Sequence, residues 1–233
     1  NKNYSIRVFT PSSREDWLLA LEYIKALAKK FDSKIISETG EEYTVDNIDK
    51  FDYEGDILYG IEGISSRVKG EDSTLYSIFG INRIVSFNQE MIDRIENSDS
   101  PIDTFSNMVK EIQYLDAFSA NQRFFRNKED GKIIGTYTLT QNLRTILPYK
   151  PSVEFENSDM VKNEDIAFWN IGLVTIDGDE NDPNSYQVVG QLDYNDFIKK
   201  LPKDKYHFID ASYILVEPLS KEKILGLLEI SVN

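Results

Sequence analysis

The single histidine of the chain, His207, stands three residues before Asp210, and the two form the one candidate acid–base pair. A histidine in contact with a carboxylate can transfer a proton near neutral pH. Residues three positions apart on a strand point to opposite faces, however, and a strand is predicted here. A lone histidine beside aromatic residues is also more often structural. The pair therefore does not predict a catalytic site.

A polar turn resembles part of a calcium-binding loop. Asp177, Asp179 and Asn181 match the first three ligand positions of such a loop. Asp182 occupies the position that requires glycine, and Val188 the position that requires a bidentate glutamate. The match is partial, so a hairpin tip rich in turn-forming residues is the favoured interpretation.

Other residues that could do chemistry each have a simpler structural explanation. Asp193 and Asp196 could be paired carboxylates, but a helix start explains both. An acidic loop could bind a cation weakly, although a solvated loop is favoured; its acids are Glu154, Glu156, Asp159, Glu164 and Asp165. Several aromatic residues could line a groove, although most such residues belong to a core; they are Tyr137, Tyr149, Phe155, Phe168 and Trp169. Three glycines lack the spacing of a phosphate-binding loop and predict turns; they are Gly60, Gly63 and Gly70.

We accordingly predict no catalytic, cofactor-binding or metal-binding residues. The chain has no cysteine, which rules out disulfides, thiolate metal sites and cysteine nucleophiles. The cytoplasm is the expected compartment, since nothing in the chain needs an oxidising one. Residues 1–3 lead directly into a predicted strand, so we expect no signal peptide, with a cleaved one left open.

The charge balance points to a class of partner. The formal net charge is −14, from 26 basic and 40 acidic side chains. Binding to nucleic acid needs clustered Lys and Arg, so we expect none. No apolar run approaches the roughly 18 residues of a membrane span, so we expect no membrane association. The acids are spread along the chain, which favours a solvated surface; the functional alternative is an acidic face for a basic protein partner.

The best-specified elements lie at the start of the chain. Residues 4–9 alternate apolar and polar side chains, which predicts a strand with Tyr4, Ile6 and Val8 facing inward. Ser12 or Ser13 can cap a helix over residues 12–31, with Glu15 or Asp16 completing a capping box. The apolar stripe of this helix predicts one face packed on a sheet; it comprises Trp17, Leu21, Ile24, Ala28 and Phe31.

Further strands and helices follow from turn and cap signals. Thr39-Gly40 and Asp130-Gly131 predict hairpins. Asp193 and Ser220 each begin a helix, with an apolar pair five residues apart around the cap. Residues 166–176 and 186–192 predict partner strands, and residues 206–216 a strand interrupted near Asp210. Residues 97–101 form the clearest linker; we predict a single domain over residues 1–233, with this linker as a possible subdivision.

Two blocks resemble known sequences. Gly190-Gln191-Leu192-Asp193-Tyr194-Asn195-Asp196-Phe197 and Leu215-Val216-Glu217-Pro218-Leu219-Ser220, with residues 13–17, are similar to bacterial families of unknown function from low-GC Gram-positive organisms. The resemblance implies a bacterial cytosolic origin and no particular activity.

These patterns predict an α+β fold with a mixed, mostly antiparallel sheet and helices packed against it. The favoured function is a non-enzymatic protein-interaction role, for which an immunity or inhibitor-like protein is one form. The alternative is a small-molecule-binding protein or an enzyme that uses carboxylates and tyrosines.

Overall fold

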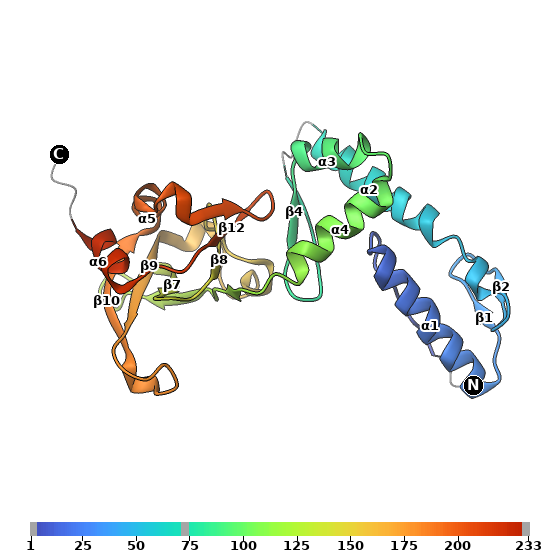
Figure 1. Cartoon of the computed structure of the whole chain (residues 1–233), viewed down its shortest axis with the longest axis horizontal. Helices are drawn as coiled ribbons and strands as arrows, with labels where there is room; N and C mark the ends of the chain where they lie inside the picture. Colours follow the sequence, from blue (N-terminus) through green and yellow to red (C-terminus); the bar gives the residue numbers. More distant parts are fainter. Residues whose placement is uncertain (1–3, 71–74, 230–233) are drawn as a thin grey trace. The chain divides into compact units, whose positions relative to one another are not determined.

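The computed structural model describes residues 4–70 and 75–229 (Figure 1). The chain divides into two compact units, residues 1–115 and residues 116–233. Helices and strands that pack together occur in both units, and the strands pair mostly antiparallel. The predicted α+β class with a mixed, mostly antiparallel sheet is therefore confirmed. The predicted linker, residues 97–101, connects two helices inside the first unit.

Within its described residues, the first unit combines four α-helices and one short 3-10 helix with two small hairpins. Its elements are α1 (Arg14–Phe31), β1 (Ile35–Ile36), β2 (Glu42–Tyr43), the short helix η1 (Ile48–Lys50), α2 (Tyr53–Val68), β3 (Tyr76–Ile78), β4 (Val85–Phe87), α3 (Gln89–Glu96) and α4 (Pro101–Gln113). Antiparallel pairs join β1 to β2 and β3 to β4. Helices α2, α3 and α4 pack on one another, and their buried aliphatic residues and Phe105 form the core.

Helix α1 begins as its capping pattern predicts. The Ser13 side chain accepts a hydrogen bond from the Asp16 N–H, and the Asp16 carboxylate accepts one from the Ser13 N–H. Trp17 and Leu21 are buried, but Phe31 is partly exposed and stacks on Tyr4. The buried stripe faces η1, α2 and α4, so α1 packs on helices where a sheet was expected.

The predicted strand over residues 4–9 is wrong. These residues have no strand assignment, although Ile6 and Val8 are half-buried on one side. Alternation correctly indicated that Ile6 and Val8 turn inward, but Tyr4, which was expected on the same buried face, is 64% exposed. A strand also needs a partner backbone to complete its hydrogen bonds. The stacked rings of Tyr4 and Phe31 show that the segment packs against α1 itself.

The predicted turns at Gly60 and Gly63 are also wrong, because both glycines lie inside α2. A helical glycine costs about 1 kcal/mol relative to alanine, a cost that burial of the helix can offset. Ile57, Ile61 and Ile64 are buried in the unit's core. Tertiary packing therefore outweighed the local preference for a turn.

The second unit contains two four-stranded sheets. Its strands are β5 (Phe118–Ser119), β6 (Arg123–Arg126), β7 (Ile133–Thr140), β8 (Thr145–Pro148), β9 (Ile166–Ile176), β10 (Tyr186–Asp193), β11 (Tyr206–Phe208) and β12 (Tyr213–Val216). One sheet has the order β10-β9-β7-β6 and the other β11-β12-β8-β5. The pairs β7–β9 and β5–β8 are parallel, and the remaining pairs in these sheets are antiparallel.

Two helices cover the first of these sheets. Helix α5 (Tyr194–Lys200) and helix α6 (Lys221–Leu228) both contact β9 and β10. Asp193 and Ser220 cap them, as the sequence predicts. The core between helices and sheets includes Tyr137 and Tyr194. The predicted hairpin turns are present as well, with positive φ angles at Gly40 and Gly131.

Candidate functional site

His207 and Asp210 occupy different parts of one hairpin. His207 is exposed on β11, paired in register with Leu215 of β12. Asp210 is buried in the turn that follows, where one carboxylate oxygen accepts hydrogen bonds from the Ser212 N–H (2.8 Å) and the Tyr213 N–H (2.7 Å). The carboxylate thus closes the turn between the strands, which is a structural role.

The other predicted carboxylate groups also act locally. Asp193 accepts hydrogen bonds from the first N–H groups of α5, and Asp196 pairs with Lys199. Asp177 pairs with Lys221, and Asp179 accepts a hydrogen bond from the Asn181 N–H at 2.9 Å. Within residues 4–70 and 75–229, no three His, Asp or Glu side chains come together in a way that could hold a metal ion.

One member of the acidic loop, Glu154, meets one member of the aromatic set, Tyr137. The Tyr137 hydroxyl lies 3.3 Å from Glu154 Oε1 and donates to it. Tyr137 is buried on β7, stacked on Trp169 and close to Tyr194. The other predicted groove residues do not join them, because Phe155 and Phe168 are exposed and Tyr149 packs on Tyr206 and Phe208.

Gln122 holds this pair in place. Its side-chain amide donates to the Tyr137 hydroxyl and to the Ser152 carbonyl. Its carbonyl oxygen accepts from the Glu154 N–H at 3.0 Å and from the Asn157 amide at 3.1 Å. Gln122 is not among the residues predicted from the sequence, and no spacing pattern points to it, since its partners lie 15 to 35 residues away.

Burial shifts the pKa values of the ionisable groups in the Glu154 cluster, which comprises Glu154, Tyr137 and Gln122 with the neighbouring tyrosines. It raises the pKa of Glu154, with a smaller contribution from the nearby charge of Glu156, while the Tyr137 hydrogen bond acts in the opposite direction. Burial also raises the pKa of Tyr137, Tyr194 and Tyr213. The tyrosines therefore stay neutral, and Glu154 holds a proton more tightly than an ordinary glutamate.

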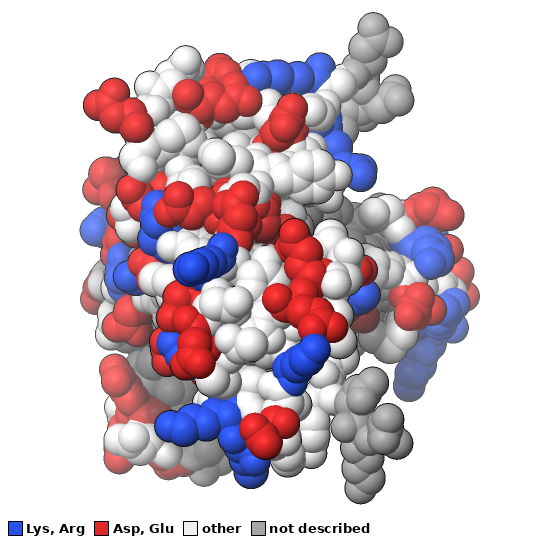
Figure 2. Space-filling model, turned by 90° about the vertical axis from the view of Figure 1, so that its right-hand side faces the viewer, with Lys and Arg blue, Asp and Glu red and all other residues white. Residues whose placement is uncertain are grey.

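The first unit carries a dense acidic stretch, residues 38–62. It contains nine carboxylates and one lysine, Lys50, for a net charge of −8. It extends from the β1–β2 hairpin through η1 into α2. Figure 2 shows the side of the molecule on which Figure 1 places this hairpin, and acidic side chains border an uncharged area there. Exposed apolar residues of the same unit include Phe9, Leu19, Leu58 and Tyr59.

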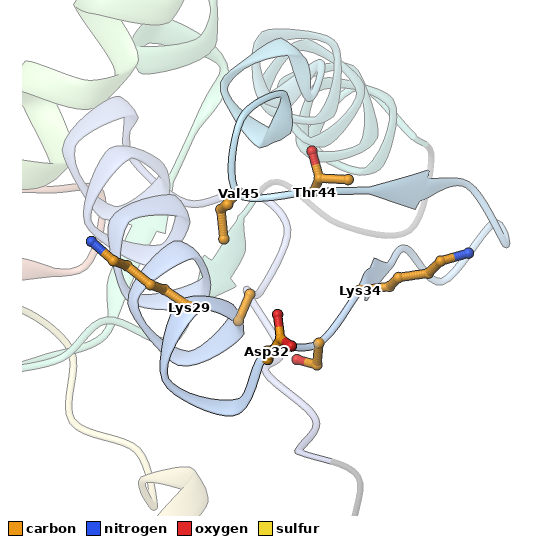
Figure 3. Close-up of a pocket in the computed structure, with 7 residues that line it drawn as sticks. Lys29, Asp32, Lys34, Thr44 and Val45 are labelled. Carbon is orange, nitrogen blue, oxygen red and sulfur yellow. The ribbon is translucent and has the colours of Figure 1, made fainter.

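A pocket of about 310 Å³ lies where the end of α1 meets the chain after β2 (Figure 3). Its lining includes Asp32, Thr44 and Val45, with two lysines at the rim. The ammonium groups of Lys29 and Lys34 point in opposite directions, and Lys34 forms an ion pair with Glu42. Because the charged groups diverge, the pocket does not gather polar groups around a ligand.

A comparison with known protein families shows which family the chain belongs to. The model described as "Domain of unknown function (DUF4299)" matches residues 1–227. The chain belongs to this family. The match runs through both compact units, so the family domain includes the acidic stretch and the Glu154 cluster. No curated protein and no solved structure matches the chain.

None of the helices that the structure describes has the length and apolar character needed to cross a lipid bilayer.

Proposed function

We propose that the protein is a non-enzymatic binding protein whose acidic stretch, residues 38–62, binds a basic protein partner. The supporting observation is the local charge of −8 on the exposed hairpin, η1 and the start of α2. A potential of this density steers a basic partner and repels polyanions such as nucleic acid. An immunity or inhibitor-like protein that masks a basic surface is one form of this function.

The cellular setting is part of the same proposal. The cysteine-free composition and the resemblance to bacterial families support a bacterial cytoplasmic protein. In that compartment the ionic strength screens charges beyond about 8 Å. The partner must therefore bring its cations into direct contact with the acidic stretch, which makes the complex sensitive to salt.

The test compares two triple variants of equal net charge. The first reverses three exposed acids of the stretch whose side chains form no hydrogen bond or ion pair among the described residues, Glu38→Lys, Asp46→Lys and Glu62→Lys. The control reverses three exposed acids of the second unit, Asp159→Lys, Glu164→Lys and Asp204→Lys. Each protein is used as bait in lysate of the native organism at low and high salt, with quantitative mass spectrometry.

The proposal expects a basic protein that wild type and control retain at low salt, that high salt releases, and that the first variant fails to retain. Equal retention by both triple variants would move the binding site away from residues 38–62. The absence of any salt-sensitive partner would contradict the function itself.

A small-molecule-binding or enzymatic role is the second candidate, and the Glu154–Tyr137 pair favours it. A carboxyl group with a raised pKa beside a neutral tyrosine is suited to proton transfer or to binding a polar ligand. A thermal-shift screen of metabolites against wild type, Glu154→Gln and Tyr137→Phe tests this role. A compound that stabilises wild type but neither variant would support it, and equal shifts in all three proteins would remove the cluster as a binding site.

A further inference from the structure

The chain that enters α1 crosses helix α2 and leaves apolar side chains exposed there. The Thr10 hydroxyl donates to the Asp56 carboxylate, at 2.9 Å from Oδ1 and 3.0 Å from Oδ2. Pro11 packs directly on Gly60 of α2. Next to these two contacts in the chain stand Phe9, with 75% of its surface exposed, and Tyr59, with 74%. Two large rings at one crossing are therefore available to a partner.

The part of α2 at this crossing, with the residues just before it, is rich in acidic side chains. Residues 51–66 contain Asp52, Glu54, Asp56 and Glu62 and neither lysine nor arginine. Arg14 forms ion pairs with Glu54 and with Asp103 of α4. The other three carboxylates form no ion pair with any lysine or arginine that the structure describes. The crossing thus combines two exposed rings with nearby residues of α2 whose carboxylates have no cation among the described residues.

The charge decides which kind of molecule can cover these rings. A second copy of the chain would bring a net charge of −14 against the same acidic edge, and like charges brought together destabilise an interface. A partner with lysine or arginine would instead neutralise Asp56 and Glu62. Its cations could also rest on the exposed ring faces of Phe9 and Tyr59.

We propose that the crossing of residues 9–11 over α2 is the docking point for a partner segment that carries apolar side chains flanked by Lys or Arg. This rests on the proposed function and specifies its partner's chemistry. The apolar side chain of the segment covers Phe9 and Tyr59 while its cations contact Asp56 and Glu62. Burial of aromatic surface contributes most of the affinity at such contacts, and the charges contribute steering.

Two synthetic peptides of equal positive charge separate these contributions. One is an amphipathic lysine–leucine peptide, and the other is a lysine–serine peptide of the same length. Fluorescence anisotropy at low salt gives their affinities for the full chain. We expect the lysine–leucine peptide to bind at least about tenfold more tightly, a difference of about 1.4 kcal/mol. Its binding should shift NMR signals of residues 9 and 56–63.

Matched variants locate the binding. Phe9 lies outside any helix or strand. Phe9→Ser, alone or combined with Tyr59→Ser, should weaken binding of the lysine–leucine peptide and leave the affinity for the lysine–serine peptide unchanged. The control removes two apolar residues of similar exposure in the second unit, Met160→Ser (73%) and Val188→Ser (69%), and should change neither affinity. Melting curves verify that each variant is folded.

The outcomes distinguish this inference from the proposed function. Equal affinity for the two peptides, or no effect of Phe9→Ser, overturns the docking point. If the peptides still bind wild type in that case and charge reversal at residues 38, 46 and 62 abolishes their binding, the acidic stretch retains its role. If neither peptide binds wild type at low salt, the proposed function falls together with the docking point.

Discussion

Replacement of Gly60 by alanine tests the crossing between residues 9–11 and α2. A Cβ added at Gly60 would lie 2.5 Å from Pro11 Cβ and 2.9 Å from Pro11 Cα, far inside van der Waals contact. At Gly63, one turn further along the same helix, nothing lies within 4 Å of the added Cβ. Both substitutions gain about 1 kcal/mol of helix propensity. The difference between the two variants therefore isolates the steric cost at Pro11.

That steric cost should be about 1–3 kcal/mol, the usual penalty for an extra methyl group in a tightly packed place. Gly63→Ala should then stabilise the protein, whereas Gly60→Ala should leave it unchanged or destabilise it by up to about 2 kcal/mol. Urea unfolding followed by circular dichroism gives both values. For a chain of this length each kcal/mol corresponds to roughly 2–4 °C in Tm.

A local measurement separates this explanation from a general loss of stability. In Gly60→Ala, the hydrogen bond between Thr10 and Asp56 should loosen, so the amides of residues 9–13 should exchange faster with solvent. Gly63→Ala should leave these amides unchanged. If Gly60→Ala proves as stabilising as Gly63→Ala, the close approach of Pro11 to α2 is wrong, and the docking point built on it loses its basis.

Three further predictions concern both units. Glu154 binds its proton more tightly in the folded protein than in the unfolded one, so the free energy of unfolding should fall as pH rises from about 4.5 through the raised pKa of Glu154. Urea unfolding across this pH range measures the fall, which Glu154→Gln should remove. Arg83 donates to the Ile112 and Leu115 carbonyls at the end of α4, so Arg83→Ala should cost about 1–3 kcal/mol in urea unfolding, of which Arg83→Lys should recover part. The two tryptophans stand in different units, Trp17 in the first and Trp169 in the second. If residues 1–233 form a single domain, Trp17→Phe and Trp169→Phe proteins should show coincident fluorescence transitions, and separate midpoints would contradict it.

Local signals predicted several helix starts and hairpin turns. The capping box at Ser13, the caps at Asp193 and Ser220, and the turn at Asp130-Gly131 all depend on residues a few positions apart. Such contacts form wherever the chain folds locally, so spacing alone identifies them. The same reasoning failed at α2, because burial of its isoleucines against α3 and α4 outweighs the low helix propensity of Gly60 and Gly63.

The residues that meet far along the chain could not be predicted. The acidic loop and the aromatic residues were both recognised, but the sequence does not indicate that Glu154 alone turns inward to Tyr137. That choice depends on Gln122, whose carbonyl fixes the Glu154 backbone. An isolated glutamine has no periodic or capping signature, so its role appears only once β7 and the loop after β8 lie together.

The two candidate sites differ in how their charges are compensated, and this difference favours the binding role. At the Glu154 cluster, every polar atom of the Gln122 amide has a partner, and the carboxylate is hydrogen-bonded to Tyr137. Such an arrangement is stable without a ligand. At the crossing over α2, Asp52 and Asp56 accept hydrogen bonds from Gly55 and Thr10. These two carboxylates and Glu62 form no ion pair within residues 4–70 and 75–229, and the rings of Phe9 and Tyr59 are exposed to water. An external cation with an apolar neighbour lowers the free energy of this surface, whereas the Glu154 cluster already satisfies its own groups.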